Sequence, residues 1–115
     1  MHNQSFYADK VIVAGGAWSQ QILGELGRSL QVEPVKGQML LYRTEPGLFQ
    51  RIILADAHYV IPRRDGHILA GSTQEYCGFD KTTTEAARDT LRHAAEALVP
   101  ALADVPTLMR RWPAV

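Results

Sequence analysis

Two β-prone runs on either side of Asp65-Gly66 constrain the fold of this chain more than any other feature. Asp-Gly favours a two-residue hairpin turn, because glycine tolerates a positive φ and aspartate reaches that region more cheaply than most residues. With such a turn Tyr59 lies opposite Ser72, and one face of the hairpin carries Tyr59, Ile61, Ser72 and Gln74. A three-residue loop with a bulge would shift the pairing, and an ordinary hairpin would place Tyr59 in a core. The sequence leaves these alternatives open.

Composition excludes several classes of function. The chain has 115 residues, of which 46% are hydrophobic and 21% charged, as expected for a globular protein with a real core. Twelve basic residues balance twelve acidic ones, so we expect no nucleic-acid or membrane partner. No apolar run approaches the roughly 20 residues that cross a bilayer. Cys77 is the single cysteine, which favours a reducing compartment and a cytoplasmic location. The four histidines have no ligand spacing, so we expect no metal site.

Near the start, residues 10–14 form a short apolar run rich in β-branched side chains. Such a run predicts a strand buried on both faces, as in a parallel sheet covered by helices. Gly15-Gly16 ends the run, Ser19 is placed to cap a helix, and Gly27 to end that helix in a left-handed conformation. No third glycine completes the G-x-G-x-x-G spacing of a dinucleotide-binding turn. On spacing alone this is a tight turn without a ligand, or a place where backbone approaches a cofactor.

The remaining segments predict further strands and one long helix. Residues 32–43 are typical of a long strand, in which Gly37 marks a bulge or a close approach. Residues 49–54 and 107–112 predict two shorter strands. Thr82 and Glu85 have the spacing of a capping box, at the head of a helix that Pro100 would break near Val99. We therefore expect an α+β fold, mainly an antiparallel sheet packed by two helices.

Several motifs in this order resemble the FAD-dependent D-amino-acid oxidase family, and within it the glycine oxidase branch associated with thiamine biosynthesis. They cover residues 8–115: K-V-I-V-A-G-G-A-W-S, P-V-K-G-Q-M-L, Y-V-I-P-R-x-D-G-x-I-L-A-G-S-T, G-F-D and W-P-A-V. The resemblance implies that residues 1–31 end an FAD-binding domain, to whose sheet the strand at 10–14 belongs. It implies that residues 32–115 form a substrate domain, truncated at its C-terminal end.

The resemblance also implies a cofactor, a reaction and a set of site residues. The cofactor is FAD, and the reaction is the oxidation of glycine or a related small amino acid or amine to the imine, with O2 reduced to H2O2. The cofactor then carries the difficult chemistry, while the protein orients the substrate. Tyr59 matches the tyrosine that helps to hold the substrate carboxylate, and Gln74 lines the same pocket. The implied cofactor contacts are Ala14, Gly15, Gly16, Trp18, Lys36, Gly37 and Gln38.

The sequence departs from the family pattern in two ways. It contains no G-x-G-x-x-G segment, and it ends at Val115, before the arginine that would clamp the substrate carboxylate. We expect an internal fragment of an oxidase that is inactive by itself and binds FAD weakly or not at all. An unpaired edge at residues 10–14 would favour self-association. The alternatives are a non-catalytic binding or interaction module that keeps the substrate-domain fold, and an unrelated small α+β domain.

Overall fold

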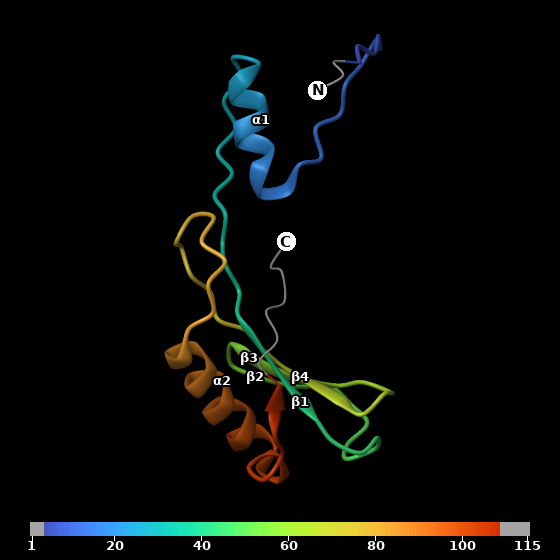
Figure 1. Ribbon diagram of the computed structural model, residues 1–115, viewed down its shortest axis with the longest axis vertical. Helices are drawn as coiled ribbons and strands as arrows, with labels where there is room; N and C mark the ends of the chain where they lie inside the picture. Colours follow the sequence, from blue (N-terminus) through green and yellow to red (C-terminus); the bar gives the residue numbers. More distant parts are fainter. Residues whose placement is uncertain (1–3, 109–115) are drawn as a thin grey trace. The chain divides into compact units, whose positions relative to one another are not determined.

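The computed structural model describes residues 4–108, which divide into two compact units (Figure 1). The first unit ends at Pro34 and the second begins at Val35. Each unit is described by itself below. Residues 109–112 of the last expected strand, and the W-P-A-V motif, lie outside the described residues.

A short helical segment is the only regular structure of the described part of the first unit. It consists of a 3-10 turn, η1 (Gly16–Trp18), followed by α1 (Ser19–Glu25). Gly27 ends the helix as predicted, with φ +68° and a 3.0 Å bond from its N–H to Gly24 O. The prediction of Ser19 as N-cap is wrong. Trp18 holds that position, and its side chain makes no capping hydrogen bond, because the 3-10 turn already winds the chain into the helix.

The predicted strand at residues 10–14 is absent. This stretch has no strand assignment, and Val11 and Ile12 are 79% and 91% exposed. A strand needs a neighbour to accept and donate its backbone hydrogen bonds. Within the described residues no segment pairs with this run. The β-branched composition alone therefore does not produce a strand here.

An antiparallel five-stranded sheet forms the second unit. Its strands are β1 (Met39–Arg43), β2 (Ile53–Ala55), β3 (His58–Pro62), β4 (His67–Gly71) and β5 (Thr107–Leu108), in the order β2-β3-β4-β1-β5. Helix α2 (Glu85–Leu98) lies along one face (Figure 1), and a 3-10 turn, η2 (Pro100–Leu102), follows it. The α+β class with an antiparallel sheet and two helices is confirmed. The buried core between sheet and helix comprises Leu40, Tyr42, Val60, Ile68, Ala70, Leu91, Ala95 and Leu102.

Helix α2 begins later than its predicted capping box. Thr84 is the N-cap, and its hydroxyl accepts a 3.2 Å hydrogen bond from the backbone N–H of Ala87. Thr82 instead belongs to the preceding loop, where its N–H and hydroxyl donate to the Asp80 carboxylate at 3.0 and 2.8 Å. The predicted break near Val99 is confirmed, since α2 ends at Leu98 and Pro100 begins η2.

The central hairpin has the three-residue loop that the sequence left open. Tyr59 pairs with Gly71, not with Ser72, so the two-residue register is wrong by one residue. Arg63 N–H donates to His67 O at 2.8 Å, which leaves residues 64–66 as the loop. Gly66 takes φ +84°, a conformation that favours glycine and is typical of the last position of such a loop. The turn glycine was thus identified correctly, and the loop length was not.

Candidate functional site

The sheet of the second unit has one face under α2 and one that α2 does not cover, which we call the open face. Side chains alternate between the two faces along each strand. Leu40, Tyr42 and Val60 are buried under α2. Their neighbours point the other way and are half-buried: Met39, Leu41, Tyr59, Ile61 and Leu69. The open face is therefore largely apolar, with one phenol on it.

Tyr59 lies directly across Gly71 on the open face. A Cβ atom built at Gly71 would meet the Tyr59 hydroxyl at 2.7 Å, its Cζ at 2.8 Å and its Cε2 at 3.1 Å. These separations are well inside van der Waals contact. The ring can occupy this position only because residue 71 has no side chain. Sequence reasoning did not select Gly71, although a glycine inside a strand commonly marks such a close approach.

A one-residue irregularity brings Gln74 to the same side as Tyr59. Met39 pairs with Gly71, and Lys36 pairs with Glu75. The three-residue step from Lys36 to Met39 is therefore matched by a four-residue step from Gly71 to Glu75. Such a bulge reverses which side the following side chains face. Gln74 consequently points away from the buried side, and it is exposed.

The alternation of side chains also places Gly37 on the open side. Its neighbours Lys36 and Gln38 are both buried, on the side of Leu40. An added Cβ at Gly37 would lie 3.9 Å from the Cβ of Ser72 and 3.4 Å from Thr73 O, and would meet nothing closer. The structure therefore brings three of the predicted site residues, Tyr59, Gln74 and Gly37, to one side of the sheet.

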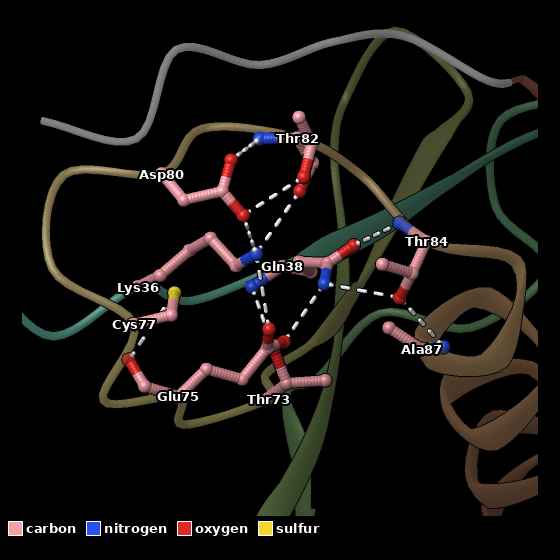
Figure 2. Close-up of polar contacts among 9 residues, drawn as sticks. All are labelled: Lys36, Gln38, Thr73, Glu75, Cys77, Asp80, Thr82, Thr84 and Ala87. Atoms are coloured by element: carbon pink, nitrogen blue, oxygen red, sulfur yellow. Dashed lines mark hydrogen bonds and ion pairs between the residues drawn. The ribbon is translucent and has the colours of Figure 1, made fainter.

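The side chain of Lys36 is directed to the other side, into a buried polar cluster (Figure 2). Its ammonium lies 3.1 Å from Glu75 Oε2 and 3.3 Å from Asp80 Oδ2, and donates to Thr82 O at 3.1 Å. The hydrogen bond to Glu75, supported by Asp80, raises the pKa of Lys36 above its ordinary value. Conversely, hydrogen bonds from Thr73, Gln38 and Lys36 lower the pKa of Glu75. Hydrogen bonds from Thr82, followed by that from Lys36, lower the pKa of Asp80.

Gln38 belongs to the same cluster, and both atoms of its side-chain amide make hydrogen bonds. Its Nε2 donates to Glu75 Oε1 at 2.8 Å and to Thr84 Oγ1 at 3.3 Å, while its Oε1 accepts from Thr84 N–H at 2.9 Å. Gln38, which directly precedes strand β1, is thereby tied to Thr84, the N-cap of α2. Of the tripeptide expected to contact a cofactor, only Gly37 lies on the side of Tyr59.

The remaining predicted contacts, Ala14, Gly15, Gly16 and Trp18, lie in the first unit. Gly16 has φ +53°, and Trp18 N–H donates to Gly15 O at 3.0 Å, so the pair of glycines makes a tight turn. A Cβ at Gly15 would meet Ile22 Cδ1 at 2.8 Å. The turn therefore packs closely against its own helix at this glycine. Ala14 is exposed, and Trp18 is half-buried.

Other kinds of site find no support in the described part of the chain. Over residues 4–108, no group of three His, Cys, Asp or Glu side chains is arranged to hold a metal ion. In the same range, no helix is long and apolar enough to cross a membrane. The residues that sequence reasoning missed are Gly71 and Glu75. Glu75 could have been identified from the Thr-x-Glu alternation at residues 73–75, which is typical of two side chains on one face of a strand.

Comparisons with known proteins identify the family of the chain. A family profile described as "FAD dependent oxidoreductase" matches residues 2–115. A glycine oxidase of Pseudomonas aeruginosa is 55% identical over 97 residues, which are 84% of this chain and 27% of that protein. The glycine oxidase of Pseudomonas putida is 47% identical over 105 residues, 91% of this chain and 28% of its own. The crystal structure of glycine oxidase from Geobacillus kaustophilus superposes with a TM-score of 0.82 at 31% identity, over 90% of this chain and 28% of that one. The chain thus spans about a quarter of the length of the curated relatives it matches.

Proposed function

Because the chain belongs to the family of FAD-dependent oxidoreductases, we propose that it supplies the substrate-binding wall of an enzyme that oxidises glycine or a related small amino acid. The observation that carries the proposal is the convergence of Tyr59, Gln74 and Gly37 on one side of the sheet. Residues 32–115 would be the substrate domain, and residues 1–31 the end of the FAD-binding domain. The division of the chain between Pro34 and Val35 supports that partition.

The open face fits one side of a flavin ring. Gly37 has no Cβ and is exposed, so a flat aromatic group can approach the backbone closely there, whereas the Tyr59 ring already covers Gly71. Gly37 would lie against the ring, and the turn of Gly15, Gly16 and Trp18 would contact the cofactor from the first unit. The chemistry that bound FAD would supply is two-electron oxidation, as hydride acceptance from the substrate α-carbon and return of the electrons with protons to O2 to give H2O2.

The chain's own residues would bind and orient the substrate. The Tyr59 phenol would donate a hydrogen bond to the substrate carboxylate, and Gln74 would bound the pocket beside it. Lys36 and Gln38, which are held in the buried cluster, would act through the fold. Met39, Leu41 and Leu69 would exclude water from the reacting carbon.

A segment exchange tests this function. The matched segment of the Pseudomonas aeruginosa glycine oxidase is replaced with the aligned residues of this chain, and glycine-dependent H2O2 production is measured. We expect activity in the exchanged enzyme. A hydrogen bond to a charged group contributes about 1.5–3 kcal/mol, so Tyr59→Phe raises KM for glycine roughly tenfold to hundredfold. Tyr76→Phe is the matched control, because Tyr76 is 68% exposed on a loop.

Two results would contradict the proposal. One is an exchanged enzyme that folds and binds FAD yet does not oxidise glycine, sarcosine or D-amino acids. That result would favour a non-catalytic module that keeps the fold. The other is a Tyr59→Phe variant with the same kinetics as Tyr76→Phe.

We further propose that the 115-residue chain alone does not oxidise amino acids. Its sequence contains no G-x-G-x-x-G turn to hold a pyrophosphate, so FAD would bind weakly. Incubation of the purified chain with FAD and glycine, followed by a peroxide assay, tests this directly. Peroxide above the level of a buffer blank would contradict it.

Self-association and location complete the proposal. Exposed Val11 and Ile12 would promote pairing between copies, and light scattering that shows a clean monomer at high concentration would refute this. We assign the reaction to the cytoplasm, because a reducing compartment preserves the exposed free thiol of Cys77.

A further inference from the structure

Gln74 has an exposed side chain, but its two neighbours are firmly held. The Thr73 hydroxyl donates to Glu75 Oε1 at 2.6 Å and accepts from Gln38 N–H at 2.9 Å. Glu75 exchanges two backbone hydrogen bonds with Lys36, both of 2.9 Å. The direction of Gln74 is therefore fixed by the anchoring of the residues on either side of it.

Both carboxylate oxygens of Glu75 take part in this anchoring. Oε1 accepts from Thr73 and Gln38, while Oε2 faces the Lys36 ammonium at 3.1 Å (Figure 2). The Lys36 side chain is only 6% exposed, and that of Glu75 is 31% exposed. Without Glu75 the shielded Lys36 ammonium would keep only Asp80 and Thr82 O as partners, so its pairing with Glu75 helps to hold the segment that carries Glu75.

Asp80 also pairs with Lys36, but it serves a different part of the loop. Its side chain is 44% exposed, and its other contacts are to Thr82, close to α2. Asp80 lies six positions from Gln74, whereas Glu75 adjoins it. The two carboxylates thus share one ammonium and differ in what they can orient.

We propose that Glu75 is a positioning residue, and that its pairing with Lys36 holds Gln74 on the open face beside Tyr59. We call this pairing the Lys36–Glu75 clamp. The inference rests on the proposed function, since it gives the position of Gln74 a purpose in substrate binding. It assigns Lys36 a role through the fold rather than through contact with the cofactor.

Spin labelling of the full 115-residue chain tests the clamp without any flavin. In a Cys77→Ser background, Gln74→Cys is labelled and its mobility is measured by electron paramagnetic resonance. We expect Glu75→Gln, which keeps the shape and removes the charge, to increase the mobile fraction of the label several-fold. Asp80→Asn, the matched control, leaves the mobile fraction close to that of the parent.

A double-substitution cycle separates positioning from a general loss of stability. If the clamp acts as a unit, Lys36→Met with Glu75→Gln gives no more mobility than the larger single effect. Thermal unfolding is followed for every variant. A lower melting temperature with unchanged label mobility, or equal effects of Glu75→Gln and Asp80→Asn, would overturn the proposal. Should Glu75→Gln fail to fold, Glu75→Asp provides the comparison, because it keeps the charge and shortens the reach.

Kinetics in the exchanged oxidase distinguish this proposal from the proposed function. We expect Glu75→Gln to raise KM for glycine by the same factor as Gln74→Ala, with kcat changed less. If Glu75→Gln makes the label mobile but Gln74→Ala leaves the kinetics unchanged, the clamp holds Gln74 in place but does not contribute to substrate binding. That result would refute the proposed role of the clamp in binding. If the label stays ordered while Tyr59→Phe raises KM, the clamp fails and the proposed function stands.

Discussion

Replacement of Gly71 by alanine is the sharpest test of the geometry around Tyr59. The new Cβ would lie 2.7 Å from the phenol oxygen and 2.8 Å from Cζ. Carbon atoms pack at about 3.5 Å or more, so the end of the ring must withdraw by roughly 0.7 Å or rotate off the strand. The backbone itself accepts alanine, because Gly71 is not among the described glycines with a positive φ.

The expected change in stability is small, and the expected change in function is large. Overpacking costs about 1–3 kcal/mol, whereas exchange of a strand glycine for alanine returns roughly 0.5–1 kcal/mol. The free energy of unfolding should therefore fall by about 0–2.5 kcal/mol. A displacement of roughly 0.7 Å would stretch a hydrogen bond of about 2.8 Å to a length at which it no longer forms. In the exchanged oxidase, Gly71→Ala should thus raise KM for glycine about as much as Tyr59→Phe.

Urea unfolding followed by circular dichroism, together with peroxide kinetics, measures both effects. Gly24→Ala is the matched control, because a Cβ at this glycine of α1 meets nothing within 4 Å. In a Tyr59→Leu background the ring is gone, and Gly71→Ala should be neutral or stabilising. An equal loss of stability with tyrosine and with leucine at position 59 would refute the argument.

Three further predictions concern the turn, the core and the buried cluster. Gly66→Ala should lower the free energy of unfolding by about 2–4 kcal/mol in urea melts, because it combines a φ of +84° with a clash against Thr44 O; a loss below about 1 kcal/mol would contradict this. Burial raises the pKa of Tyr42 to about 12, and its hydroxyl has no hydrogen-bond partner among the described residues. Tyr42→Phe should therefore leave the melting temperature unchanged or higher, and a clear decrease would reveal a partner. The pKa values of Glu75 and Asp80 are lowered on folding, so their stabilisation is complete above the ordinary values of 4.5 and 3.8 and is lost as the pH falls below them. Acid titration of the melting temperature should show a decline that is shallower in the Glu75→Gln/Asp80→Asn double variant, and parallel curves would exclude this origin.

Sequence patterns predicted the side of the sheet on which the candidate site lies, but for a reason that is only partly correct. A two-residue loop was expected to put Tyr59 and Gln74 on one face. The real loop is one residue longer, which by itself would have separated them. The bulge between Gly71 and Glu75 adds a second one-residue offset and restores the shared face. Neither offset can be predicted from the alternation of apolar and polar residues, because both depend on local backbone geometry.

The roles of Lys36 and Gln38 could not be predicted from their own segment. Their partners Glu75, Asp80 and Thr84 are 37 to 46 positions away in the chain, and a spacing rule does not reach that far. The same limit explains the strand expected at residues 10–14. A run of β-branched residues favours the extended conformation, but a strand forms only where a neighbouring segment supplies its backbone hydrogen bonds.

The tripeptide Lys36-Gly37-Gln38 indicates which positions of this fold can be varied in directed evolution. Its two outer side chains point inward and secure the start of α2, while the middle residue faces the open side. Substitution of all three residues would remove the hydrogen bonds that Lys36 and Gln38 make in this cluster. Substitutions restricted to positions 37, 59 and 74 would change the open side of the sheet and leave those hydrogen bonds in place.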